Sequence, residues 1–154
     1  MKARTIALTM ALCFVAGAVC LASDVQIGTW KLNEAKSTFA PGASKNNTVV
    51  YQAVGDEVKV TVEGTDNSGK PTRNEWTGKL DGKFYPVTGD PNTDELAYKQ
   101  INDRTLDLTT KKGGKVVVTG RIVVAADGKV RTVTVHQTDS SGKKVTSTAV
   151  YDKQ

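Results

Sequence analysis

The chain is 154 residues long, 38% of its residues are hydrophobic, 24% are charged, and its formal net charge is +5. This length fits one domain and excludes a multidomain protein. Its two cysteines, Cys13 and Cys20, lie near the amino terminus, which excludes a disulfide scaffold, thiolate metal sites and cysteine catalysis in the rest of the chain.

The first 22 residues have the composition of a secretory signal peptide. Lys2 and Arg4 precede an apolar run over residues 6–19, and the segment ends in small residues up to Ala22. The run is too short for a transmembrane helix. We therefore expect cleavage after Ala22, no stable membrane insertion, and a mature domain of residues 23–154 that is periplasmic or secreted, with a net charge of +3.

Cys20 raises the alternative of a lipoprotein, in which a cysteine at the cleavage site is lipidated. Such sites favour a small residue directly before the cysteine and a leucine two positions earlier. Here Val19 precedes Cys20 and the leucine is absent. Simple cleavage after Ala22 is the favoured prediction, and lipidation at Cys20 is the alternative.

From residue 23 onward the pattern predicts strands joined by short turns. Residues 57–63 and 130–135 alternate apolar and polar side chains, and residues 116–124 are rich in β-branched side chains, as in half-buried and buried strands. Glycine turns typical of hairpins separate the runs, at Gly55-Asp56, Asn67-Ser68-Gly69, Asp81-Gly82, Gly113-Gly114, Asp127-Gly128 and Ser141-Gly142. About ten strands at this spacing are typical of an all-β barrel or sandwich.

One longer connection interrupts this pattern, over residues 33–47. Asn33 is a suitable cap for a single helical turn over residues 34–36, and Pro41-Gly42 would end it. No segment shows sustained helical periodicity. The sequence therefore predicts almost no helix.

Two segments of the chain resemble each other. Residues 49–70 and 122–143 are identical at 11 of 22 positions without a gap. Two hairpins with the same turn chemistry would explain this, and so would two equivalent meanders, one in each half of a closed barrel. We favour the equivalent meanders.

Closure into a barrel is predicted because an open sheet of ten strands would expose two edges that invite aggregation. A barrel of about ten strands encloses more space than facing side chains fill. We therefore expect a single antiparallel up-and-down barrel with a cavity lined by apolar and polar side chains.

The ends of the domain resemble a known superfamily. Residues 27–32 contain Gly28-x-Trp30, which is similar to the opening of lipocalins and fatty-acid-binding proteins, the calycins, and residues 145–151 resemble the last strand of fatty-acid-binding proteins. Over about 130 residues the chain is most similar to small secreted bacterial lipocalin-like proteins. The resemblance implies a ligand held inside the barrel.

Two departures from fatty-acid-binding proteins stand out. That family holds a carboxylate with an Arg-x-Tyr pair on its last strand, whereas here Tyr151 is preceded by Ala149 at the arginine position. The helical lid of that family does not fit into residues 33–47. A fatty-acid carrier of the usual kind is therefore not expected.

Arg131 is the most informative charged residue. It is in phase with Val133 and Val135, so it lies inside the barrel if those valines do, where its planar guanidinium would bind a carboxylate or phosphate. The alternative is an arginine at the strand end whose head group reaches water.

Aromatic residues supply the other candidates. Trp30, near the first turn, is predicted to plug one end of the barrel, with its N–H bonded to a carbonyl. Trp76 lies among polar residues, so it either lines the cavity or lies on the surface. The tyrosines in strand phase are candidate ligand contacts or strand packing: Tyr51, Tyr98 and Tyr151, with Tyr85 alongside.

No catalytic, metal or cofactor site is predicted. His136 is the only histidine and is expected to face solvent, which excludes a typical zinc site, and no serine lies in a nucleophile-elbow motif. The acidic turn around Asp90 and Asp94 lacks the spacing of a calcium loop. Export and the mild positive charge argue against nucleic-acid binding.

We therefore predict a monomeric, secreted, lipocalin-like barrel that binds a small apolar or amphipathic molecule and does not catalyse a reaction. The alternative is a barrel with a filled interior that acts through its outer surface as an envelope interaction protein or inhibitor.

Overall fold

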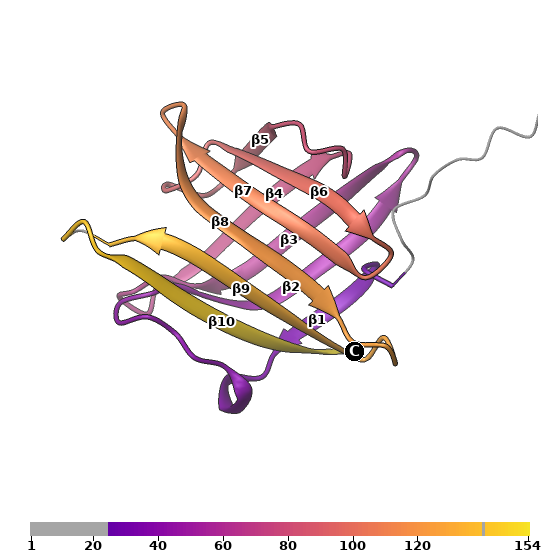
Figure 1. The fold of residues 1–154 in the computed structure, drawn as a ribbon, viewed down its shortest axis with the longest axis horizontal. Helices are drawn as coiled ribbons and strands as arrows, with labels where there is room; N and C mark the ends of the chain where they lie inside the picture. Colours follow the sequence, from indigo (N-terminus) through magenta and orange to yellow (C-terminus); the bar gives the residue numbers. More distant parts are fainter. Residues whose placement is uncertain (1–24, 140) are drawn as a thin grey trace, which may run out of the picture.

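The computed structural model describes residues 25–139 and 141–154, so the predicted signal peptide and Cys20 lie outside the described residues. Ten antiparallel strands form a closed barrel in which strands adjacent in sequence pair and the last pairs with the first (Figure 1). The predicted all-β, up-and-down barrel of about ten strands is confirmed. The strands are β1 (Gly28–Leu32), β2 (Lys45–Val54), β3 (Glu57–Thr65), β4 (Pro71–Gly78), β5 (Tyr85–Thr88), β6 (Glu95–Asn102), β7 (Thr105–Lys112), β8 (Lys115–Val124), β9 (Val130–Thr138) and β10 (Lys144–Lys153).

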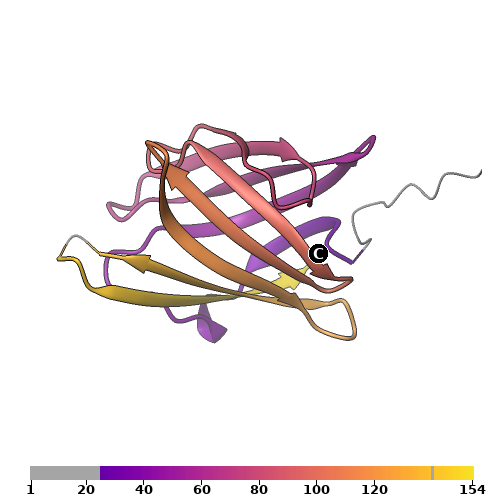
Figure 2. The same cartoon turned by 45° about the horizontal axis from the view of Figure 1, so that its top comes forward.

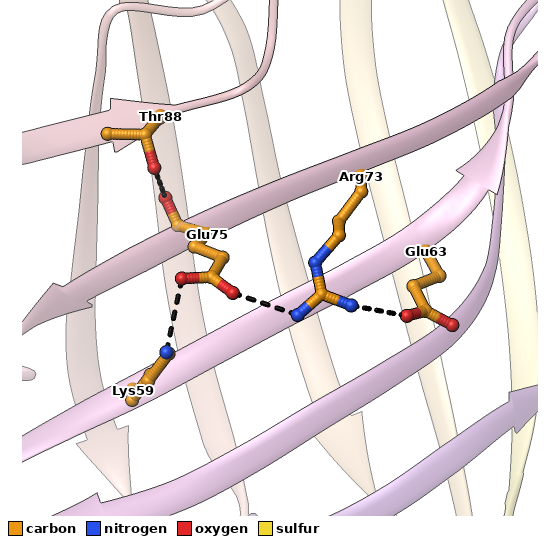
Figure 3. A network of polar contacts seen from close by, with 5 residues as sticks. All are labelled: Lys59, Glu63, Arg73, Glu75 and Thr88. Atoms are coloured by element: carbon orange, nitrogen blue, oxygen red, sulfur yellow. Dashed lines mark hydrogen bonds and ion pairs between the residues drawn. The ribbon is translucent and has the colours of Figure 1, made fainter.

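Side chains alternate between the inside and the outside of the barrel along each strand. On β3 the three valines are buried, and the polar residues between them, Lys59 and Thr61, lie outside. Figure 3 shows this outer face, where Arg73 of β4 lies between Glu63 and Glu75, and Lys59 pairs with Glu75 at 3.1 Å. Exposed ion pairs add little stability, so burial of the inward apolar side chains holds the barrel together.

The turns form two sets, because successive strands run in opposite directions. One end of the barrel carries the β3–β4, β5–β6, β7–β8 and β9–β10 turns together with residues 39–44, and we call it the mouth. The other end carries the remaining turns and residues 25–27, and we call it the floor. Fully buried side chains such as Trp30, Leu106 and Val124 fill the barrel near the floor.

The wall is interrupted at the mouth between β8 and β9. Their pairing begins at Val118 and Gln137, so Lys115 and Val116 of β8 pair only with β7. Both views show the β7–β8 and β9–β10 hairpins pointing apart at this end (Figures 1 and 2). The backbone ladder of the wall is therefore not continuous here.

The wall is also thin at β5, which has two registered pairs with β4 and two with β6. Pro86 has no N–H with which to extend the ladder toward β4. The ring of Tyr85 instead packs over Gly78, where an added Cβ would lie 2.5 Å from it. Trp76 of β4 spans the gap, because its indole N–H donates to the carbonyl oxygen of Leu96 on β6 at 2.9 Å.

The connection between β1 and β2 contains the predicted single helical turn, the 3₁₀ helix η1 (Glu34–Lys36). Asn33 caps it by accepting a hydrogen bond from the Lys36 N–H at 3.3 Å. The chain then runs beside β10, where Thr38 pairs with Thr148. η1 is the only helix in this connection, so the helical lid is absent there, as predicted from the length of residues 33–47. Across residues 25–139 and 141–154 no helix has the length and apolarity to span a membrane.

The two similar segments form similar hairpins, but they do not divide the barrel into equal halves. Residues 49–70 cover β2, β3 and the next turn, and residues 122–143 cover the equivalent part of β8, β9 and the turn after it. In both turns an aspartate carboxylate, Asp66 or Asp139, accepts backbone N–H groups two and four residues ahead. The related strands are six positions apart in a ring of ten, so each half of the strand order contains one of the two hairpins, but no exact two-fold symmetry relates them.

Candidate functional site

A cavity of about 620 Å³ occupies the upper part of the barrel and opens at the mouth. Inward side chains from nearly every strand line it, and the turns around residues 66–67 and 89–93 form part of its rim. Small-molecule sites in proteins have volumes in this range. The interior is therefore not filled by its own side chains.

The lining changes in character from the floor to the mouth. Arg131 and tyrosine rings lie at the lower end, aliphatic residues such as Val133, Ile122 and Leu108 form the middle, and polar residues such as Asn74 and Gln137 lie nearer the rim. Such a gradient suits a molecule with a charged end and an apolar body.

Arg131 projects from the start of β9 into the cavity and is only 2% exposed. Its guanidinium carbon lies 5.1, 4.9 and 4.8 Å from the ring centres of Trp30, Tyr51 and Tyr151. Its Nε and Nη1 atoms are buried and have no hydrogen-bond partner in the protein. Of the two arrangements that the sequence allowed, the buried one is found.

This arrangement is costly in the absence of a ligand. Three aromatic faces attract a cation, and each such contact contributes about 0.5–2 kcal/mol. They do not satisfy the N–H donors, and an unpaired buried charge costs several kcal/mol. Val58 occupies the equivalent position of the similar hairpin and is buried and apolar, so the barrel itself does not require an arginine there.

Three tyrosines line the lower end of the cavity, and the rings of two of them, Tyr51 and Tyr151, face the guanidinium. The Tyr51 hydroxyl donates to the Tyr98 hydroxyl at 3.2 Å. Burial raises the pKa of Tyr151 to about 12 and raises the pKa of Tyr98 well above its ordinary value, although the charge of Arg131 acts in the opposite direction. Both phenols are therefore neutral at physiological pH and can donate hydrogen bonds to an anion.

The two tryptophans lie outside the lining of the cavity. Trp76 is 2% exposed and packs edge-on against Tyr98, with ring centres 4.9 Å apart, so it supports a lining residue from behind. Trp30 is fully buried below Arg131 and donates its indole N–H to the Gln26 carbonyl at 2.9 Å. This is the carbonyl bond and the placement at one end that the sequence predicted for Trp30.

Several lining residues were not among the candidates from the sequence, and Thr110 is the one with an unpaired polar group. Thr110 of β7 lines the cavity, and its Oγ1 atom is buried without a hydrogen-bond partner. The signal was present, because Thr110 is in phase with Leu106 and Leu108, which also face inward.

Other polar side chains lie on the outside of the barrel. Arg121 binds Asp107 through Nε and Nη2 at 2.6 and 3.0 Å, and His136 is exposed beside the Thr146 hydroxyl. Asp94 accepts hydrogen bonds from Lys112 and the Gly113 N–H. In the part of the chain that the structure describes, no group of acidic, histidine or cysteine residues is placed to hold a metal ion.

No family model and no curated protein sequence matches this chain. Among solved structures, it is similar to a Schistosoma mansoni fatty-acid-binding protein in complex with arachidonic acid, with a TM-score of 0.61 and 19% identity over 86% of this chain and 98% of that chain. It also matches EF1p2_mFAP2b bound to DFHBI, with a TM-score of 0.49 and 11% identity over 86% of this chain and 97% of that one. The first likeness shows that the chain has the barrel fold of fatty-acid-binding proteins.

Proposed function

We propose that this protein binds a small, partly apolar molecule inside its barrel and acts as a monomeric carrier or binding protein without catalysis. The observation that carries the proposal is the cavity of about 620 Å³ inside the closed barrel, open at the mouth. The fatty-acid-binding protein of similar fold was solved with arachidonic acid, which agrees with an apolar or amphipathic ligand. The alternative of a barrel acting only through its outer surface would not need this space.

We also propose that the protein works in the periplasm or outside the cell, as a small lipocalin-like protein of bacterial origin. The support is the signal-peptide composition of residues 1–22. A binding protein in that compartment would carry molecules that enter, leave or assemble in the cell envelope.

Native mass spectrometry of the protein purified from the envelope fraction of its own host tests both proposals. We expect a mature chain that begins at Ser23 and an additional mass that disappears on denaturation. A mature chain that carries no ligand, and that binds none from an extract of host lipids and metabolites, would overturn the carrier proposal in favour of a surface function. A retained leader would overturn the proposed location, and a lipid adduct on Cys20 would assign the protein to the envelope as a lipoprotein.

A further inference from the structure

The cavity contains two buried polar groups without partners in the protein, one near each of its ends. The first is the guanidinium of Arg131, with its Nε and Nη1 atoms, and the second is the hydroxyl of Thr110. Buried polar groups in folded proteins are nearly always hydrogen-bonded. Two orphaned groups in one cavity therefore indicate what its occupant supplies.

The Arg131 group calls for an anion. Nε and Nη1 lie on different sides of the planar guanidinium, and an N–H donor that carries part of a positive charge makes its strongest hydrogen bonds to oxygens of an anion such as a carboxylate. No other cation lines the cavity among the described residues, and its acids, Asp66 and Asp90, belong to turns at the mouth. The site therefore suits a single negative charge, and the neutral phenols of Tyr98 and Tyr151 add donors beside it.

The Thr110 group calls for a second, uncharged polar atom. Arg131 pairs across to Val124 of β8, and Thr110 pairs across to Val118 of the same strand. These β8 residues are six positions apart, which corresponds to about 20 Å along the strand. The space between the two groups is lined by aliphatic residues, among them Ile122, Leu108 and Val133.

We infer that the ligand is a carboxylic acid with an apolar body and a second oxygen function, such as a hydroxyl, toward its other end. The carboxylate binds Arg131 near the floor, the apolar body lies along the aliphatic middle, and the second oxygen bonds Thr110 nearer the mouth. This inference rests on the proposed ligand-binding function and names its substrate class. A plain alkyl chain would leave the Thr110 hydroxyl unpaired.

Three probes with the same chain length separate the two contacts: dodecanoate, ω-hydroxydodecanoate and dodecanol, each titrated into the mature protein by calorimetry. Dodecanoate is expected to bind at least tenfold more tightly than dodecanol, since a charge-assisted hydrogen bond supplies that factor. ω-Hydroxydodecanoate is expected to bind at least as tightly as dodecanoate, because a cavity able to bond the hydroxyl compensates for its removal from water.

Two variants assign each preference to its residue. Arg131→Met should abolish the preference for dodecanoate over dodecanol. Thr110→Val keeps the side-chain shape and should make ω-hydroxydodecanoate bind about tenfold more weakly than dodecanoate. Arg121→Met and Thr109→Val are the matched controls on the outer face, and both should keep the native order of affinities.

The outcomes are distinct. Equal affinity for dodecanoate and dodecanol overturns the role of Arg131. If the ratio of the affinities for ω-hydroxydodecanoate and dodecanoate is the same in the native protein and in Thr110→Val, the role of Thr110 is overturned. In both cases binding itself still supports the proposed function. Failure of all three probes to bind overturns this inference and counts against the carrier proposal. If Arg131→Met does not fold, Arg131→Lys tests the same contact, because a lysine lacks the Nε and Nη donors of the guanidinium and should weaken the binding of dodecanoate selectively.

Discussion

Arg131 illustrates what a sequence pattern can and cannot establish about a single residue. Its phase with Val133 and Val135 placed it on the inner face, but the same pattern allowed the head group to reach water at the strand end. The outcome depends on Trp30, Tyr51 and Tyr151, which surround the guanidinium. They come from strands far apart in the sequence, so only the folded barrel reveals this environment.

The first prediction concerns the cost of this buried charge. Arg131→Met should raise the free energy of unfolding of the ligand-free protein by about 1–3 kcal/mol, because it removes an unpaired charge and keeps most of the apolar volume. Urea denaturation with circular dichroism measures this change. A lower stability of the variant would show that the contacts with the three rings outweigh the desolvation of the guanidinium.

The second prediction concerns pH. The pKa of Tyr151 is about 12 in the folded protein, above its ordinary value of 10.0, so the unfolded chain loses this proton first as the pH rises. Stability from this group is fully present below about pH 10 and is lost between about pH 10 and 12, by about 2–3 kcal/mol. Tyr151→Phe should therefore lose less stability than the native protein between pH 9 and pH 12.

Unfolding curves in urea at the two pH values provide the measurement, and every other titratable group is common to both proteins. An equal loss of stability in Tyr151→Phe would show that the phenol is not protected by burial in the folded state.

At the scale of elements, strands with regular alternation could be predicted from the sequence, and the irregular one could not. Residues 57–63 and 130–135 lie within β3 and β9, as predicted. β5 was not recognised as a separate strand, because it is four residues long and contains Pro86. The direction of the Trp76 side chain could not be predicted either, since polar residues flank it in the sequence. It depends on the weakly paired region around β5, which the indole bridges by its hydrogen bond to Leu96.

The third prediction tests the packing of Tyr85 on Gly78, beside the weakly paired strand β5. Gly78→Ala should destabilise the protein by about 1–3 kcal/mol, because the added methyl would lie 2.5 Å from the ring of Tyr85. In a Tyr85→Ala background the same substitution should cost clearly less, since the two positions are in direct contact. Thermal unfolding of the four proteins measures this coupling, and additive effects would contradict the proposed role of the ring.

At the scale of the whole molecule, the closed ten-strand barrel could be predicted because turn spacing, alternation and the avoidance of sheet edges all favoured it. The grouping of the turns at the mouth is a consequence of this topology, since alternate turns of an up-and-down barrel share one end. The shape of the cavity could not be predicted, because it depends on how far Arg131, Tyr98 and their neighbours extend into a common space. Alternation with Leu106 and Leu108 was enough to place Thr110 on the inner face, but its unpaired hydroxyl is visible only in the folded barrel.

The fourth prediction uses the proximity of the two ends of the described domain. Lys153 Nζ donates to the Val25 carbonyl at 3.1 Å, and the Gln154 N–H donates to the Thr29 carbonyl at 3.0 Å. A circular permutant that joins Gln154 to Val25 through a short linker and opens at Gly113-Gly114 should keep all ten strand pairings. It should fold and bind dodecanoate as the unpermuted chain does. A permutant that folds without binding would show that the β7–β8 turn contributes to the site.

The pairing of β1 with β10 also determines when the barrel can form. Trp30 in the first strand pairs with Lys153 in the last, so the ring cannot close before the end of the chain has been made. Contacts this distant along a chain are typical of slowly folding proteins. Until β10 has been made, β1 and β9 each lack a neighbour, and strands without a neighbour are edges at which an incomplete chain associates with others.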